Sequence, residues 1–476
     1  MTSDTAPTTR TLTLVVASAL FMESLVSTVI ATALAAMAAD LQVDPLTLKL
    51  AFTAYYVALA IFIPVSGWCA DRFGARTVFA LSIGVFTAAS VCCALAWSLG
   101  SLIAGRFLQG VGGAMMLPVG RLILLRVIPK REMVGAMAWL SIPTLFAPIM
   151  GPPVGGFITT YYHWRGIFWL NVPVGLAGLV LAWTLVPQVK AEQLRPMDWP
   201  GFALTGLGLS LAIFGFTLAG SRAGSGLLAG EMTVAGLVLL AIYVRHARRS
   251  AHPILDLSLL RIATFRLSMA AGVLFRLSVG ALPFLLPLML QVGFGMSAFE
   301  SGTLTFASAV GAMSMKLTAG PILRRWGFRR VLCVNAVVSS ALIAACALFN
   351  ASTPGVVVMV VLLVGGFFRS LQFTSLNTLG YADVEPAQMS QATSLVGVTQ
   401  QLSLAGGVAV AALLLESARH AGSRSDLVAA DFQLAFVAVG ALAALSLGFY
   451  LRLAPDAGAE VSGHRKHAQA GPDADR

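Results

Sequence analysis

The stretch that decides the fold is Gly67-Trp68-Cys69-Ala70-Asp71-Arg72-Phe73-Gly74-Ala75-Arg76, because a weaker copy follows as Gly320-Pro321-Ile322-Leu323-Arg324-Arg325-Trp326-Gly327-Phe328-Arg329. Residue 320 comes 253 positions after residue 67, and each copy lies in a short polar gap between two long apolar stretches. In a membrane chain, a helix–basic loop–helix unit repeated about half a chain length apart predicts two homologous helical bundles. Many secondary transporters are built in this way, with the substrate site between the halves. The repeat therefore indicates transport before any substrate is considered.

The composition is that of an integral membrane protein. The chain is 58% hydrophobic and only 11% charged, with a mean hydropathy of +0.85, whereas soluble domains carry about 25% charged residues. A net charge of +11 would suggest a nucleic-acid partner in a soluble protein. Here the Lys and Arg residues fall in short gaps between apolar segments, as they do in cytoplasmic loops. We therefore expect membrane lipid, and no nucleic acid, as a partner.

A helix that spans the hydrocarbon core of a membrane needs about 20 predominantly apolar residues. By that measure the sequence predicts an all-α protein with fourteen spanning helices. Their ranges are 12–36, 48–68, 77–97, 102–126, 133–160, 166–187, 200–220, 228–245, 265–290, 298–319, 330–349, 354–378, 388–416 and 431–452.

The positions of Lys and Arg predict the orientation. They crowd the gaps after the even-numbered helices, as at Arg72 and Arg76, and are sparse in the opposite gaps, as at Lys49. The positive-inside rule then places both termini in the cytoplasm, in a bacterial-type inner membrane. The first ten residues are polar and lack a cleavage site, so the first apolar segment is predicted to be a retained helix and not a signal peptide.

The repeat and the spans together predict the domain layout. A cytoplasmic tail at 1–11 precedes a six-helix bundle at 12–187, and a second six-helix bundle follows at 264–453. Between them, 188–263 holds two inserted helices and an interfacial linker, whose stretch 252–261 is too short to span but suits a helix lying on the membrane surface. Residues 454–476 are expected to form a disordered cytoplasmic tail.

Four motifs of this chain resemble those of a known family. They are Gly67-x-x-x-Asp71-Arg72-x-Gly74-x-Arg76, Arg106-Phe-Leu-Gln109-Gly110-Val-Gly112-Gly113, Gly151-Pro152-Pro153-Val-Gly155-Gly156 and Trp164-Arg165-Gly-Ile-Phe-Trp-Leu-Asn171-Val-Pro173-Val-Gly175. On these motifs the chain resembles the major facilitator superfamily, and within it the fourteen-helix drug:proton antiporters of the EmrB/QacA type. The resemblance covers roughly residues 10–455 and implies the major facilitator fold. It does not imply a particular substrate.

Two of the motifs are predicted to gate the transporter. In the first, glycines such as Gly67 and Gly74 let the chain turn between closely packed helices, and Asp71 can accept hydrogen bonds that hold the cytoplasmic side shut. The alternative is that Arg72 and Arg76 only set the topology. In the other motif, Gly151, Pro152, Gly155 and Gly156 are expected to kink a helix and admit a partner backbone. Here the alternative is tight packing with no gating role.

A proton-coupled transporter needs a group that binds a proton inside the membrane. Of twenty acidic residues, only Glu23 falls near the middle of a predicted span, and all six histidines lie outside the spans. By elimination Glu23 is the predicted proton carrier, with Arg106 as one possible partner. The alternative is a permanently ionised Glu23 paired with an Arg. The chain departs from the family at Val26, where an Asp is usual, and at Ala35, which replaces the usual Pro.

Three arginines are predicted at membrane depth, and they suggest a positive cavity. They are Arg106, Arg276 and Arg369, of which Arg276 is reached from Glu23 by the repeat offset of 253. One interior carboxylate against three permanent cations favours an anionic, zwitterionic or neutral amphipathic substrate. The alternative is that the arginines are bound to backbone carbonyls and amide side chains, which leaves no net field. The candidate polar companions are Gln109, Gln291, Gln372 and Asn377.

The sequence thus predicts a proton-coupled antiporter that exports small amphipathic compounds by alternating access, acting as a monomer. The proton gradient would supply the energy, and neither a metal nor another cofactor is expected. The alternative is a dedicated exporter or importer of one metabolite, possibly a carboxylate, on the same fold. A membrane-embedded enzyme is disfavoured because the predicted spans contain no His and no long loop joins them. A channel is disfavoured because no ring of pore-lining charge recurs.

Overall fold

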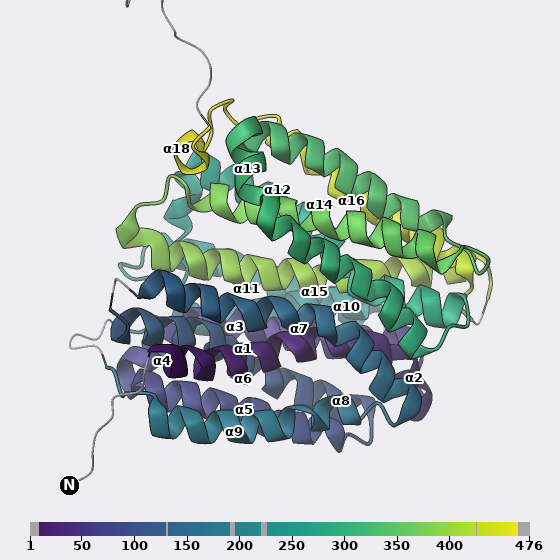
Figure 1. Ribbon diagram of the computed structural model, residues 1–476, viewed down its shortest axis with the longest axis horizontal. Coiled ribbons are helices and arrows are strands. Elements are labelled where there is room, and N and C mark those ends of the chain that lie inside the picture. Colours follow the sequence, from purple (N-terminus) through teal and green to yellow (C-terminus); the bar gives the residue numbers. More distant parts are fainter. Residues whose placement is uncertain (1–8, 130–131, 191–195, 220–225, 425, 465–476) are drawn as a thin grey trace, which may run out of the picture.

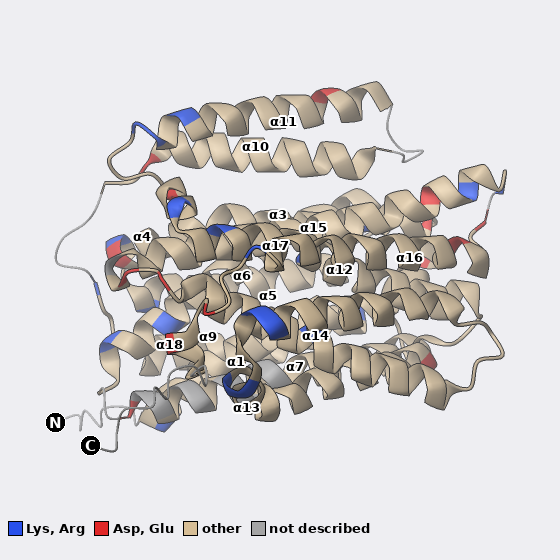
Figure 2. Ribbon diagram, turned by 90° about the horizontal axis from the view of Figure 1, so that it is seen from above, with Lys and Arg blue, Asp and Glu red and all other residues tan. Residues whose placement is uncertain are grey.

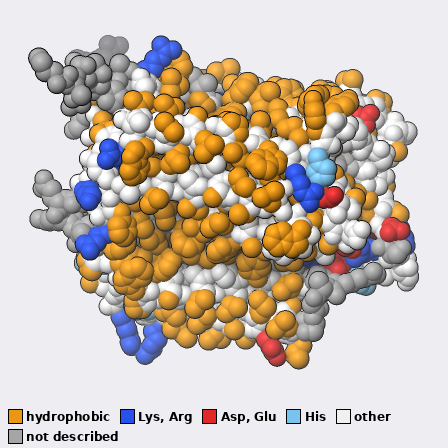
Figure 3. Space-filling view, turned by 90° about the horizontal axis from the view of Figure 1, so that it is seen from below, with side chains coloured by type: hydrophobic (Ala, Val, Ile, Leu, Met, Phe, Trp, Pro, Cys, Tyr) orange, Lys and Arg blue, Asp and Glu red, His pale blue; other side chains and the backbone are white. Residues whose placement is uncertain are grey.

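The computed structural model describes residues 9–129, 132–190, 196–219, 226–424 and 426–464, and this part of the chain contains helices and no strands. Twelve of the described helical segments are long and apolar enough to cross a membrane. Figure 3 shows one face of the molecule, on which hydrophobic side chains cover most of the middle and Lys and Arg gather at one edge. Such a surface is the expected one for a protein whose surroundings are lipid.

The N-terminal half is a bundle of helices that follow one another closely. Two of its long segments are bent: α1 continues through a 3-10 turn into α2, and α3 continues through another into α4. The bounds are α1 Thr9–Val29, α2 Leu34–Asp40, α3 Lys49–Phe62, α4 Ser66–Phe73, α5 Ala75–Ala94, α6 Leu99–Val127, α7 Met133–Tyr161, α8 Gly166–Trp169 and α9 Asn171–Leu185.

The C-terminal half is a second bundle, separated from the first by an inserted helix pair. The inserted helices are α10 Trp199–Leu218 and α11 Gly226–Ala247. The second bundle holds α12 Ala263–Leu288, a π-helical turn Met289–Gly293, α13 Ala298–Ala345, α14 Gly355–Tyr381, α15 Met389–Ala421, α16 Ala429–Leu445 and α17 Leu447–Tyr450, and a short α18 Ala459–Ser462 follows it.

The predicted apolar segments overlap these helices to within a few residues, with two differences of detail. The predicted helices 298–319 and 330–349 both lie in α13, which is interrupted by a non-helical residue, Gly327, at φ 71° and ψ 162°. The predicted interfacial helix at 252–261 is only a five-residue 3-10 turn, Leu257–Arg261. Tyr243 of α11 holds the non-helical chain before this turn, because its hydroxyl bonds both the N–H and the C=O of Leu255 at 2.9 Å.

We call the end that contains the start of α1, the turn between α4 and α5, and α18 the inner end, and the end that contains α2 and α8 the outer end (Figure 1). Most Lys and Arg residues lie toward the inner end in Figure 2. The segment expected as a disordered tail begins there with ordered chain, because His464 Nδ1 bonds Arg324 O of α13 at 2.8 Å. Residues 1–8 and 465–476 of the predicted tails lie outside the described residues.

The sequence repeat is a structural repeat with the same offset of 253. Gly110 of α6 lies against Ala58 of α3, and the equivalent residues Leu363 and Gly311 lie against each other where α14 crosses α13. Likewise α1 crosses α7 at Gly151, and α12 crosses α15 at the equivalent Leu404. Both copies of the first motif turn at a glycine with positive φ, 94° at Gly74 and 71° at Gly327. The two halves are therefore built on one plan.

The hydrophobic cores divide the molecule along its length. At the outer end one core is shared by both halves, from Phe52 and Trp164 in the first to Phe284 and Phe436 in the second. At the inner end each half has its own core, around Phe79 and Phe86 in the first and around Phe275 and Phe328 in the second. The halves are thus packed together at the outer end.

The inserted pair α10 and α11 lies at one side of the two halves (Figure 2). Its residues Leu209 and Tyr243 share a core with Ala60 of α3 and with Leu395 of α15. The pair therefore packs beside the seam where α3 of one half meets α15 of the other.

Candidate functional site

Glu23 lies near the middle of the 32-residue span Thr9–Asp40 and is half-buried. Among the described residues it makes neither an ion pair nor a hydrogen bond. Its neighbourhood is defined at Gly113 of α6, where an added Cβ would lie 3.6 Å from Glu23 Cγ and 3.4 Å from Tyr55 Oη. Residues of α1 and α3 therefore meet beside a glycine of α6, around a carboxyl group with no basic partner.

Arg106 is fully buried inside the N-terminal half. Its guanidinium donates to Gln109 Oε1, and Gln109 Nε2 donates to Ser90 Oγ at 2.8 Å. Its Cζ lies 4.2 Å from the centre of the Tyr55 ring, which is a cation–π distance. The predicted partners Glu23 and Arg106 are thus brought to the same tyrosine but are not paired directly.

The predicted cavity residues of the C-terminal half divide into separate contacts. Arg276 Nη2 donates to Asn377 Oδ1 at 2.7 Å, which unites two of them. Arg369 donates instead to Ser308 of α13, at 2.5 Å, and Gln372 accepts from Asn335 of α13, at 2.9 Å.

Gln291 has a different position from the other predicted cavity residues. Its Nε2 donates to Thr32 O at 3.0 Å, which joins the C-terminal half to the N-terminal half. The six residues predicted as one substrate cavity are therefore dispersed. They form one pair across α12 and α14, two separate contacts within the C-terminal half and one contact between the halves, and the sixth, Gln109, bonds Arg106 in the N-terminal half.

The motif between α4 and α5 is anchored within the N-terminal half. Arg126 of α6 donates to Asp71 Oδ1 at 2.7 Å. At Gly74 a Cβ would meet the side chain of Gln188, whose Oε1 accepts from Arg76 N at 3.1 Å. Gly67 and Arg72 are exposed, and a Cβ on Gly67 would meet open space. In the second copy the equivalent residue is Arg329, whose side chain donates to Leu451 O in the segment after α16. Arg76 makes the corresponding contact with its backbone N–H, which donates to Gln188 in the segment after α9.

The glycines of α7 let two other helices approach. Gly151 and Gly155 face Thr28 and Thr32 of the first long segment, and an added Cβ would collide with either threonine. Gly156 faces Ala298 O at the start of α13, which belongs to the other half. A Cβ on Gly302 of α13 would likewise collide with Pro152 O. The motif therefore forms part of the contact between the halves at the outer end.

A network of four charged residues at the outer end also joins the halves, and the sequence prediction missed it. Lys49 Nζ lies 3.4 Å from Glu416 Oε2, and both side chains are at most 4% exposed. Arg419 bonds Asp44 at 2.5 Å and lies 3.7 Å from Glu416. In the sequence these residues lie at helix ends and look like loop charges. Only the packing of α3 against α15 pairs residue 49 with residue 416.

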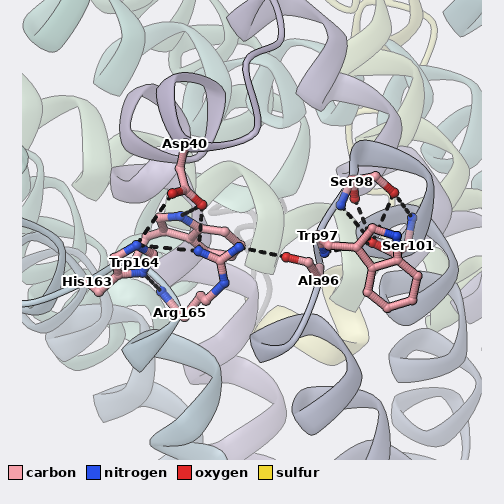
Figure 4. Close-up of polar contacts among 8 residues, drawn as sticks. All are labelled: Asp40, Ala96, Trp97, Ser98, Ser101, His163, Trp164 and Arg165. Carbon is pink, nitrogen blue, oxygen red and sulfur yellow. Dashed lines mark hydrogen bonds and ion pairs between the residues drawn. The ribbon is translucent and has the colours of Figure 1, made fainter.

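The Trp164-Arg165 motif closes the outer end of the N-terminal half (Figure 4). Trp164 Nε1 and Arg165 Nη1 donate to Asp40 Oδ2 at 3.1 and 2.5 Å, and Arg165 Nη2 donates to Ala96 O at 2.7 Å. The guanidinium also stacks 4.4 Å from the Trp164 ring. All of these contacts lie inside one half, so the motif holds α2 and the loops before α6 and α8 together.

Two repeated helical bundles with charged and amide side chains at membrane depth are the architecture of a multi-pass membrane transporter. A family model described as "Major Facilitator Superfamily" matches residues 16–200 and 268–473. The chain belongs to this superfamily, and so it is a transporter and not an enzyme. The two matched ranges leave out residues 201–267, which contain α10, α11 and the linker after them.

The chain is also similar to individual proteins. It is 36% identical over 428 residues to the "Probable transport protein HsrA" of Haemophilus influenzae, covering 90% of this chain and 92% of the relative. It is 34% identical to the "Putative multidrug resistance protein MdtD" of Escherichia coli, covering 98% of this chain and all of the relative. Among solved structures, a D-xylose–proton symporter matches with a TM-score of 0.67 at 14% identity, covering 94% and 98%. At that identity the likeness concerns the fold alone.

Proposed function

We propose that the protein is a proton-coupled antiporter that exports small amphipathic compounds across the bacterial cytoplasmic membrane by alternating access. The observation that carries the proposal is Glu23, a mid-span carboxyl group that has no basic partner among the described residues. Such a group can exchange a proton without breaking an ion pair, and intramembrane carboxyls are typical of proton relays. The likeness to a relative named for multidrug resistance supports drug-like cargo.

We further propose fourteen membrane crossings, in two bundles of six with α10 and α11 inserted between them, and cytoplasmic termini. Two features raise the number above the twelve candidate spans. The span Ala298–Leu348 is 51 residues long and turns at Gly327, so it is long enough for two crossings. Helix α7 has 29 apolar-rich residues, enough for one more. The Lys and Arg residues at the inner end support cytoplasmic termini.

In this orientation the conformation described is closed toward the outside. The shared outer core, the Lys49–Glu416 pair and the Gln291–Thr32 bond all hold the halves together there. Rocking of the halves would have to break these contacts and form new ones at the inner end. In our scheme a proton reaches Glu23 when the site faces outward, and its release inside favours loading of the next substrate.

The family's usual helix-1 aspartate is replaced by Val26 in this chain, and the greater exposure of Glu23 supports the proposal that Glu23 takes over its task. Val26 is buried at 4% exposure, whereas Glu23 one turn earlier is half-buried beside Tyr55. Through Tyr55 a change of charge at Glu23 reaches Arg106, Gln109 and then Ser90. This chain of contacts links the proposed proton site to helices α3, α5 and α6.

A second candidate is a dedicated exporter or importer of one metabolite. The observation that favours it is Arg276, whose buried guanidinium has an amide partner but no carboxylate partner among the described residues. A site of this kind selects acidic cargo, whereas a broad drug exporter has less need of one. A transport profile restricted to a single compound would identify this alternative.

The test is substrate-induced proton release in proteoliposomes over cationic, neutral and anionic compounds. Wild type is compared with Glu23→Gln and with Glu385→Gln, which removes an exposed carboxylate at the inner end. We expect release by wild type and by Glu385→Gln, and none by Glu23→Gln. Release that persists in Glu23→Gln would place the proton site elsewhere, and the compounds that trigger release would define the class of cargo.

A further inference from the structure

A small cavity of about 10 Å³, enough for one water molecule, lies in the C-terminal half between α12, α14 and α15. Its polar lining is Ser268 and Arg276 of α12 together with Asn377 of α14, and its apolar lining includes Met269, Leu376 and Val396. The cavity therefore combines a fixed positive charge and two hydrogen-bonding side chains with an apolar wall.

The cavity follows one stripe of α12. Positions 268, 272 and 276 are one turn apart and so lie on the same helix face. The middle position is Gly272, where an added Cβ would lie 3.0 Å from Arg276 Nη1. The guanidinium thus bends back along the helix over a residue that has no side chain.

The hydrogen-bonding groups in this cavity are incompletely partnered. Arg276 is 2% exposed, and Nη2 donates to Asn377 Oδ1 at 2.7 Å, but Nε and Nη1 have no hydrogen-bond partner in the described part of the chain. Ser268 is 5% exposed, and its Oγ has no hydrogen-bond partner there either. Buried N–H and O–H groups are rarely left unpaired in native proteins. Two such residues on the same wall are suited to bind a group with several acceptor oxygens.

The charge around Arg276 points to an anion. No Asp or Glu of the described residues is within ion-pair distance of it, and the titratable groups that act on its charge are Tyr381 and Tyr450. A guanidinium stays protonated and binds carboxylates through two parallel hydrogen bonds. The repeat relates Arg276 to Glu23, so equivalent positions carry a proton-binding group in one half and a cation in the other.

We propose that Arg276, Ser268 and Asn377 bind the carboxylate of the transported compound, and that the cavity widens on loading so that the hydrocarbon part of the compound lies against Met269, Leu376 and Val396. The cargo is therefore an acidic amphipathic molecule. This proposal rests on the proposed transport function and deepens it. The guanidinium donates to the two carboxylate oxygens, the Ser268 hydroxyl donates to one of them, and Gly272 leaves the space that the guanidinium occupies.

The test is equilibrium binding of radiolabelled benzoate to the purified full-length protein, with competition by benzyl alcohol, benzylammonium and chloride. These probes share a phenyl ring or a negative charge, but only benzoate has both. We expect benzoate to bind at least tenfold more tightly than the other three. The variants are Arg276→Gln, Gly272→Ala, and Arg266→Gln as a control on the same helix, where the arginine is exposed and bonds Leu260 O.

We expect benzoate affinity to fall at least tenfold in Arg276→Gln and Gly272→Ala and to stay unchanged in Arg266→Gln. Gly272→Ala keeps the charge and improves helix propensity, so it reports on the site even if Arg276→Gln folds poorly. Unchanged affinity in both site variants, or no benzoate binding to wild type, would overturn the proposal. Equal competition by chloride would mean a site for inorganic anions and would overturn it too. Proton release that depends on Glu23, with no benzoate binding, would keep the antiport function and reject only the acidic cargo.

Discussion

Tyr55 is the residue on which the N-terminal site depends. Its ring stacks on Arg106 at 4.2 Å, and its hydroxyl lies on the side of Glu23. A buried guanidinium needs several partners, and Arg106 Nε has none among the described residues. The aromatic ring is therefore a large share of what stabilises the arginine in the apolar interior.

Two substitutions of Tyr55 separate these roles. Tyr55→Phe keeps the ring, so we expect a change of less than about 1 kcal/mol in unfolding free energy. Tyr55→Leu removes a desolvated cation–π contact worth about 2 kcal/mol and leaves a cavity, so it should destabilise by about 2–4 kcal/mol. Thermal unfolding of the purified variants measures both. Equal destabilisation by the two would mean that the ring is not what holds Arg106.

At the scale of elements, the turn between α4 and α5 fixes how two helices pack. Gly74 has φ 94°, and its lack of a side chain lets Gln188 pack against it. The Gln188 side chain also bonds Arg76 N and Thr77 Oγ1. The segment after α9 is thus docked on the turn, and Ala75 N donates to Val189 O at 2.9 Å. The glycine is required here by both its backbone angle and its lack of a side chain.

The two glycines of the first motif make a matched pair of variants. Gly74→Ala should destabilise by about 1–2 kcal/mol from the left-handed backbone alone, and more where Gln188 must move. Gly67→Ala places a methyl group in open space on a helix, so it should be neutral or stabilise by about 0.5–1 kcal/mol. Melting temperatures of the two proteins give the comparison. If Gly67→Ala melts like wild type but no longer transports, then Gly67 is needed in another conformation, as the gating hypothesis requires.

The helices and the repeat could be predicted from the sequence because apolar length and motif copies are local signals. The predicted segments overlap the observed helices, and the offset of 253 recurs in the contacts of Gly110 and Gly151. The partners of the charged side chains could not be predicted. Arg369 bonds Ser308 and Lys49 pairs with Glu416, and both contacts depend on which helix faces which. Glu23 and Arg276 stand out as membrane-depth charges, but only the packing reveals that neither has an ionic partner within the described ranges.

For the whole molecule, the decisive contacts are those between the halves at the outer end. Lys49 and Glu416 are buried together, with Arg419 and Asp44 completing two positive and two negative charges. Such a buried network adds little net stability compared with apolar residues of the same shape, but loss of one member costs about 3–5 kcal/mol because it leaves a charge unpaired. In a transporter this free-energy cost destabilises only the conformation that buries the pair. Loss of one member therefore shifts the equilibrium toward the conformation in which the outer end is open.

The last prediction therefore concerns this equilibrium. With the five native cysteines replaced, Thr32→Cys reports on the outer contact, because Thr32 is 1% exposed and its carbonyl accepts from Gln291. Adding Lys49→Met should raise labelling of this cysteine by a membrane-impermeant maleimide several-fold. Adding Glu416→Leu as well removes the excess negative charge and leaves the Arg419–Asp44 pair, so it should return labelling toward the starting level, which is the signature of a coupled pair. Labelling that rises equally in the single and double variants would show that bulk packing, and not the charge pair, keeps the outer end closed.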